Sequence, residues 1–285
     1  MKKSFLIYVL AGAILLNLSI HSLAKETEDP YDKNKGISDN FVLTAGFYMP
    51  SLSTNIRLDS STLGTGTDLN FENDLDLENS LTIFRVDGHL RLFRWLSLEF
   101  GYYNLTRDTT TILNKTIQFG NEVFTANADV DASVQTEVIK AALAFSFIND
   151  GNVEFGFSLG GNIILLNASL NSITADIQES VDEIAPIPLV GVHAYLTLSP
   201  GLFLKGNLQY FTLALQDMDG SALDFRGVIE YYPLENIGVG AGINLFDFNF
   251  NITNIEVEEG GETYDLSGKF NYNYTGIVAY VIIAL

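Results

Sequence analysis

The sequence has no cysteine, few basic residues and no second long apolar run. Without cysteine, neither a disulfide bond nor a thiolate metal site can form. The chain has 15 basic residues against 35 acidic ones, a net charge of −20, so no basic stripe exists to displace the counterions of nucleic acid. Beyond the N-terminus no stretch reaches the roughly 18 uninterrupted apolar residues of a membrane helix. Nucleic acid is therefore a poor candidate partner, and a helical membrane protein is not indicated.

The informative region is 81–105, which predicts two strands joined by a tight turn. Apolar and polar residues alternate strictly through both strands, and a period of two indicates β-structure. In the first strand the apolar face holds Phe84, Val86, Gly88, Leu90 and Leu92, and the other face holds Arg85, Asp87, His89 and Arg91. In the second strand Leu96, Leu98, Phe100 and Tyr102 lie opposite Ser97, Glu99, Gly101 and Tyr103.

Such an apolar face is unusually uniform for a surface, and such a charged face is unusual for a buried one. A β-barrel in lipid satisfies both, because apolar residues face the acyl chains and charged residues face a wet lumen. The rival fold is a soluble lipocalin-like barrel, which needs an apolar interior. Inward-facing Arg85, Asp87 and Arg91 argue against that rival.

The N-terminus resembles a secretory signal, with Lys2 and Lys3 preceding an apolar core from Phe5 to Ile20. A small-x-small sequence ending at Ala24 predicts cleavage there, and an uncleaved anchor is the alternative. We therefore expect a signal peptide over 1–24, a periplasmic lead-in over 25–40 and one barrel domain over 41–285.

The fold predicted is all-β, a single antiparallel transmembrane barrel of about ten strands, with eight as the alternative. Short and long connections alternate, as expected for short periplasmic turns and long external loops; the connection at 217–220 is the one short loop on the long side. The predicted strands are 41–49, 81–92, 95–107, 134–148, 153–168, 186–199, 201–216, 221–232, 237–250 and 269–285.

The ninth predicted strand changes phase, because Val239, Ala241 and Ile243 are odd-numbered whereas the phenylalanines from Phe246 are even-numbered. A β-bulge near Leu245 would explain the change. The same phenylalanines (Phe246, Phe248 and Phe250) lie near a predicted strand end, which suggests an aromatic girdle at the membrane surface.

The last strand, with Gly276, Tyr280 and Leu285, loosely matches the C-terminal strand of Gram-negative outer-membrane barrels. In architecture the chain from about 41 to 285 resembles the OmpA-like/OmpW-like porin class, with Leu285 departing from the usual terminal aromatic residue. The resemblance implies a location in the cell outer membrane. The implied partners are the lipid bilayer, lipopolysaccharide and the barrel assembly machinery.

Strand phase places twelve ionisable residues in the lumen. They are Arg85, Asp87, His89, Arg91, Glu99, Lys140, Glu154, His193, Lys205, Asp224, Arg226 and Glu230. Leaving out the histidines, this lumen charge network contains five bases and five acids, and buried charges must be paired or wet. We expect ion pairs that fill a narrow lumen; a small, gated pore is the alternative.

The protein is predicted not to be an enzyme and to need no cofactor. Its predicted mature part has two histidines, His89 and His193, and both lie nearer the periplasmic turns than the external mouth. The external loops are acidic, and Asp74, Asp76 and Glu78 are weak candidates for a divalent cation. The sequence favours a structural or porin-like role in the outer membrane. The alternative is a surface adhesin, receptor or cation-binding barrel whose external ligand is unknown.

Overall fold

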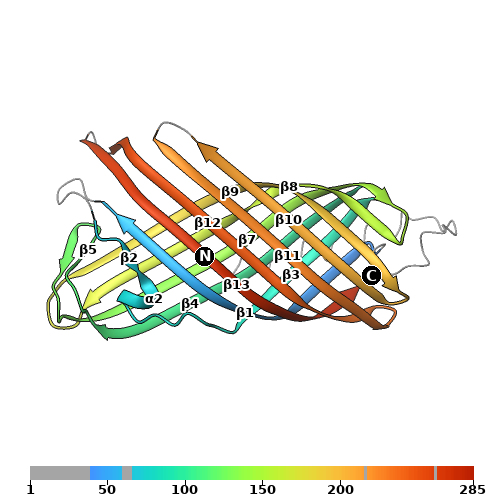
Figure 1. Ribbon diagram of the computed structural model, residues 1–285, viewed down its shortest axis with the longest axis horizontal. Coiled ribbons are helices and arrows are strands. Elements are labelled where there is room, and N and C mark those ends of the chain that lie inside the picture. Colours follow the sequence, from blue (N-terminus) through green and yellow to red (C-terminus); the bar gives the residue numbers. More distant parts are fainter. Residues whose placement is uncertain (1–38, 60–65, 215–216, 260–261) are drawn as a thin grey trace. The chain divides into compact units, whose positions relative to one another are not determined.

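The computed structural model describes residues 39–59, 66–214, 217–259 and 262–285, which all belong to one unit, Asn34–Leu285. The predicted signal peptide and nearly all of the lead-in lie outside the described residues. Figure 1 shows long strands crossing the barrel obliquely. The elements are β1 (Phe41–Leu58), β2 (Leu69–Asn70), α2 (Phe71–Asp74), β3 (Ile83–Phe93), β4 (Leu96–Ile112), β5 (Ile117–Phe119), β6 (Glu122–Phe124), β7 (Asp129–Asn149), β8 (Val153–Ser172), β9 (Gln178–Ser199), β10 (Leu202–Ala214), β11 (Met218–Leu234), β12 (Ile237–Glu259) and β13 (Glu262–Ala284).

The long strands close into a ring in which each pairs antiparallel with its neighbours. The order is β13, β12, β11, β10, β9, β8, β7, β4, β3 and β1, and β1 pairs with β13 to close it. The closing ladder runs from Val42 opposite Ala284 to Leu58 opposite Gly268. The ring therefore has ten strands, as predicted, and the alternative of eight is wrong.

Tight turns gather at one end of the ring, after β3, β7, β9 and β11. In the turn before β8, the backbone N–H groups of Val153 and Asn152 donate to Asp150 over 2.8 and 2.9 Å. These bonds hold the pKa of the Asp150 carboxyl below its usual range. The charged form of Asp150 thus stabilises this turn above the pKa that it has in the unfolded chain.

Most strands run farther toward the loop end than predicted. β1 ends at Leu58 rather than at residue 49, and β7 begins at Asp129 rather than at residue 134. The prediction followed alternating apolar residues, which end where the wall leaves lipid. Backbone pairing continues because ladder hydrogen bonds need no apolar side chain.

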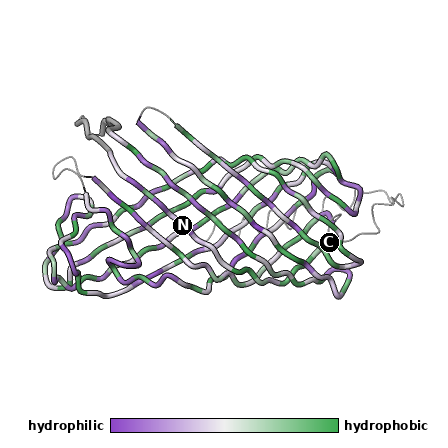
Figure 2. Tube along the Cα trace, in the orientation of Figure 1, coloured by the Kyte–Doolittle hydropathy of each residue, from purple (hydrophilic) through white to green (hydrophobic). Residues whose placement is uncertain are grey.

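The outer face carries an apolar belt nearest the tight turns. Its large side chains include Phe47, Phe84, Phe157, Val192, Leu204, Ile229, Val239, Ile277 and Val281. Phe84 is 60% exposed, whereas its neighbour Arg85 is 4% exposed. Figure 2 shows this alternation of apolar and polar residues along the strands. An apolar exterior around a charged interior is the arrangement of a membrane-spanning barrel.

The predicted bulge near Leu245 is wrong. The ladder between β12 and β13 is continuous from Ile237 opposite Ile283 to Ile252 opposite Gly268. Phe246 and Phe248 are buried inside the barrel, so they form no external girdle. β12 therefore keeps the same residues facing inward along this ladder. In the part of β12 nearer the loops, the inward positions are occupied by aromatic residues.

The loops at the other end fold into a cap made of β2, α2, β5 and β6 (Figure 1). The cap packs on a buried apolar cluster that includes Leu69, Phe71, Ile117 and Phe124. The side chain of Asn70 accepts a hydrogen bond from the Asn73 N–H over 2.7 Å and begins the short α2 helix. Within the described ranges, no helix is both long and apolar enough to cross a membrane.

Candidate functional site: the charged lumen

The lumen charge network forms because alternate residues of every strand point inward. Nine of the twelve predicted residues line a cavity of about 140 Å³, among them His89, Glu99 and Lys205. The other three, Arg91, Glu154 and His193, are buried close to the tight turns. The structure thus places all twelve side chains inside the ring.

Asp87 on β3 holds two guanidinium groups. Arg85 binds both carboxylate oxygens, with nitrogen–oxygen distances of 2.7 and 2.9 Å. Arg226 on β11 lies 2.8 Å from one of the same oxygens. The planar Arg85 group also lies 4.9 Å from the centre of the Tyr103 ring, which adds a cation–π contact.

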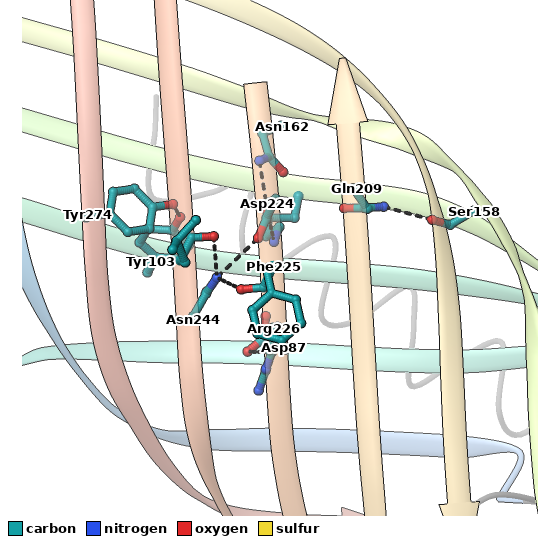
Figure 3. A network of polar contacts seen from close by, with 12 residues as sticks. Asp87, Tyr103, Ser158, Asn162, Gln209, Asp224, Phe225, Arg226, Asn244 and Tyr274 are labelled. Carbon is teal, nitrogen blue, oxygen red and sulfur yellow. Dashed lines mark hydrogen bonds and ion pairs between the residues drawn. The ribbon is translucent and has the colours of Figure 1, made fainter. Parts of the chain in front are cut away.

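Asp224 on β11 is the second centre of the lumen (Figure 3). The ammonium group of Lys140 pairs with it, and the amides of Asn162 and Asn244 donate to it over 3.4 and 3.1 Å. Arg85 donates to the oxygen of the same Asn244 amide. Asn244 therefore joins the Asp87 and Asp224 centres into one hydrogen-bonded group.

Two more carboxylates are held on the same level of the lumen. Glu230 pairs with Lys205 at 2.7 Å and accepts a hydrogen bond from the Tyr280 hydroxyl over 2.8 Å. Glu99 accepts from the Tyr195 hydroxyl over 3.0 Å. These hydrogen bonds and the ion pair offset the free-energy cost of removing the two carboxylates from water, as a low-dielectric interior requires.

Near the tight turns Arg91 and Glu154 form a separate buried pair, with a nitrogen–oxygen distance of 2.8 Å. Ser146 donates to Glu154 and lies 3.2 Å from Nε2 of His193. That nitrogen faces both the hydroxyl and the carboxylate, whereas Nδ1 of His193 has no hydrogen-bond partner. A catalytic triad needs the carboxylate on the nitrogen opposite the serine, so these residues do not form one.

An aromatic layer lies beside the charged cavity toward the cap. The rings of Tyr48, Tyr103 and Tyr274 pack edge to face, with centroids 5.9 to 6.2 Å apart. The hydroxyls of Tyr103 and Tyr274 share a hydrogen bond (Figure 3). Phe246 stacks on Tyr274 at 5.0 Å and completes the layer.

Strand phase places Tyr103 on the charged face, and it is also the signal for the other neutral members of the interior, which the predicted lumen network leaves out. Asn162, Asn244, Ser146, Tyr48 and Tyr274 all share this phase. The prediction of a girdle for Phe246, Phe248 and Phe250 is wrong because the preference of aromatic residues for strands is the same on either face.

The acidic loop residues do not converge. Asp74 pairs with Lys115 at 2.8 Å and accepts from the Asn70 N–H, while Asp76 accepts from Thr111. The backbone carbonyl of Glu78 accepts from Arg107. Across the described residues, no group of three or more histidine, aspartate or glutamate side chains is placed to hold a metal ion.

Comparison with known proteins gives a fold and no family. No family model matches the sequence, and no curated protein matches it. The outer membrane protease OmpT of Escherichia coli is similar in structure, with a TM-score of 0.52, 12% identity, and coverage of 86% of this chain and 97% of that one. The transport unit of the autotransporter AIDA-I of Escherichia coli covers 96% of this chain and 98% of its own at a TM-score of 0.40 and 11% identity.

At 12% sequence identity, the similarity to OmpT shows the fold alone. Together with the apolar belt and the charged lumen, that fold defines the class: this is an outer-membrane β-barrel protein.

Proposed function

We propose that this protein is a structural barrel of the outer membrane whose closed lumen passes at most small solutes. The observation that carries the proposal is the ion pair between Arg226 on β11 and Asp87 on β3, at 2.8 Å. Three strands, β12, β13 and β1, separate β11 from β3 around the ring, so this pair spans the lumen.

Other contacts support closure at the same level. The hydrogen bond from Arg85 on β3 to Asn244 on β12 and the one from Tyr195 on β9 to Glu99 on β4 also join strands that are not neighbours. The remaining cavity of about 140 Å³ is small for a passage. Beyond it lie the aromatic layer and the cap. Barrels with open aqueous channels are generally larger, with 16 to 18 strands.

Conductance of the purified barrel in planar bilayers tests this proposal. We expect no stepwise currents from the wild type, and currents from a triple variant, Arg85→Ala, Arg226→Ala, Tyr274→Ala, that removes the side chains crossing the lumen. Phe84→Ala on the apolar belt is the matched control and should stay silent. Stepwise wild-type currents that change in Arg85→Ala or Glu230→Ala would instead establish the porin-like role.

The second candidate is binding at the cell surface, and the folded cap favours it. Arg107 on β4 contacts Glu72 of α2 and donates to Thr54 on β1 over 2.8 Å, so the cap is ordered against the wall. An ordered acidic surface outside the bilayer suits a protein or cation partner. Loss of cell or cation binding when residues 114–126 are replaced by a short glycine-serine link, with the barrel still folded, would support this role.

We also propose that the protein is not an enzyme. His89 lines the lumen cavity and His193 is buried beside Glu154, so both lie away from the cap, where an external substrate would arrive. A general base must reach its substrate directly or through one water. Hydrolysis of peptide or lipid esters by the purified barrel that is lost in His193→Ala would contradict this proposal.

A further inference from the structure

A second cavity lies between the aromatic layer and the cap, and it differs in chemistry from the charged one. Its volume is about 530 Å³. Its lining is mostly apolar and includes Ile164, Leu166, Phe211, Leu213, Phe248 and Phe250, and it also contains the charged residues Arg57, Glu183 and Lys269. A cavity of this volume is in the range that holds a small ligand, and a mostly apolar lining favours a ligand that is itself largely apolar.

This cavity reaches through the barrel wall at β9. Its lining includes Ile184, Pro186 and Pro188, whose places in the strand turn them outward. The ladder between β9 and β10 ends at Val190 opposite Tyr210. Beyond that pair β9 continues to Gln178 paired with β8 alone, and in the ranges that the structure describes no residue of β10 pairs with it, although Phe211 and Leu213 of β10 line the same cavity.

The two prolines explain why the ladder stops there. The carbonyl oxygen of Ile187 points toward β8. This direction follows from the position of Gly161 in β8, since a Cβ atom added to Gly161 would lie only 2.4 Å from that oxygen. The backbone N–H and C=O groups of successive residues in a strand point alternately toward its two neighbouring strands. The backbone of Pro186 and Pro188 therefore points toward β10. Proline has no N–H to donate, and two prolines at alternate positions remove two donors from the same edge.

The residues around the opening are large side chains on the outer face of the barrel. Val190 and Tyr210, which border it, are outward residues with exposed fractions of 59% and 47%, and Ile184 is 67% exposed. The short connection between β10 and β11 leaves this part of the wall lower than the long strands β9 and β12 on either side. The cavity therefore opens on the outer surface of the barrel, beside apolar residues at the outer margin of the apolar belt.

We propose that this cavity binds one long acyl chain, which enters sideways from the membrane between β9 and β10. The apolar volume holds the chain, and the Pro186 and Pro188 edge keeps the wall unpaired so that the chain can pass. This site is independent of the lumen charge network, and it stands whether or not the lumen conducts. A free fatty acid and an acyl chain of a membrane lipid share this chemistry.

The test is electron paramagnetic resonance of the barrel in lipid nanodiscs with stearic acid that carries a nitroxide on its chain. We expect a strongly immobilised component in the wild type. Ala185→Trp, which fills the cavity from β9, should reduce it at least fivefold, and Leu213→Trp, which fills it from β10, should do the same. Ala241→Trp on the outer face is the matched control and should equal the wild type, since both see the same lipid shell.

Two further arms complete the experiment. A phospholipid with the same nitroxide shows whether a membrane lipid also supplies the chain. Replacing Pro186 and Pro188 by valine restores the missing donors and should slow uptake of the fatty acid, whereas Pro233→Val near a tight turn should not. Each variant is first checked for heat-modifiable migration. Equal immobilised components in the wild type and in both filled, folded variants would overturn the proposal, whatever the conductance result.

Discussion

At the scale of single residues, this barrel depends on how each buried charge is matched. Arg91 and Glu154 are nearly inaccessible, and their pairing at 2.8 Å offsets the cost of removing both from water. Glu154 also accepts from Ser146, so the carboxylate has several partners. A buried charge that loses its main partner keeps its desolvation cost without compensation.

We expect Arg91→Met to lower the free energy of unfolding by about 3–5 kcal/mol, because it leaves the Glu154 charge buried and unpaired. Urea unfolding of the barrel in lipid vesicles measures this change. Arg94→Met in the adjacent turn is the control, since Arg94 is exposed and its loss should cost less than about 1 kcal/mol. A similar loss in both variants would show that burial of the pair does not matter.

At the scale of elements, the length of a strand and the folding of the loops beyond it depend on different contacts. β4 continues past the apolar belt and carries Arg107 inward to Glu72 and Thr54. These contacts tie α2 to the wall, while a buried apolar cluster joins the hairpin of β5 and β6 to the same part of the barrel. The cap is therefore joined to the barrel through a buried arginine and an apolar cluster, together with the short pairing of β2 with β1.

Arg107→Ala should loosen the cap and leave the ring intact. We expect faster amide hydrogen exchange over residues 69–78, while exchange in β12 stays unchanged, because the backbone ladders of the ring do not depend on the Arg107 side chain. Lys115→Ala is the control: it removes a largely exposed pair with Asp74, so its effect should be small. Unchanged exchange over 69–78 in Arg107→Ala would show that the cap is held without Arg107.

At the scale of the whole molecule, the membrane selects which face of the sheet is outside. The barrel has an apolar belt around a lumen whose charges pair with one another, so lipid and lumen each meet matching chemistry. The absence of cysteine makes this orientation directly measurable, because an introduced cysteine is unique in the chain.

We expect nitroxide labels at Phe84→Cys and Leu98→Cys to collide with oxygen dissolved in the bilayer. Labels at Arg85→Cys and Glu99→Cys should be shielded from lipid. Power-saturation measurements in vesicles, with oxygen and a water-soluble nickel complex as paired probes, compare the two sets. The opposite pattern would mean that the sheet is closed the other way round.

The strand count, the closed ring and the inward phase of the charges could be predicted from the sequence, because alternation follows from local backbone geometry. The phase of β12 could not, since an inward aromatic residue and an outward one look alike in sequence. The α2 turn was missed because its helix is held by Asn70, Asp74 and the cluster under the cap.

By itself, then, the sequence determined the outward and inward faces of the strands in which apolar and charged residues alternate, because that choice follows residue by residue from a period of two. Only the tertiary structure decided that Asp87 meets Arg226 across the lumen, and that the ladder between β9 and β10 ends at Val190. Those outcomes depend on the stagger of strands around the ring, which joins residues far apart in the chain and leaves no local pattern in the sequence.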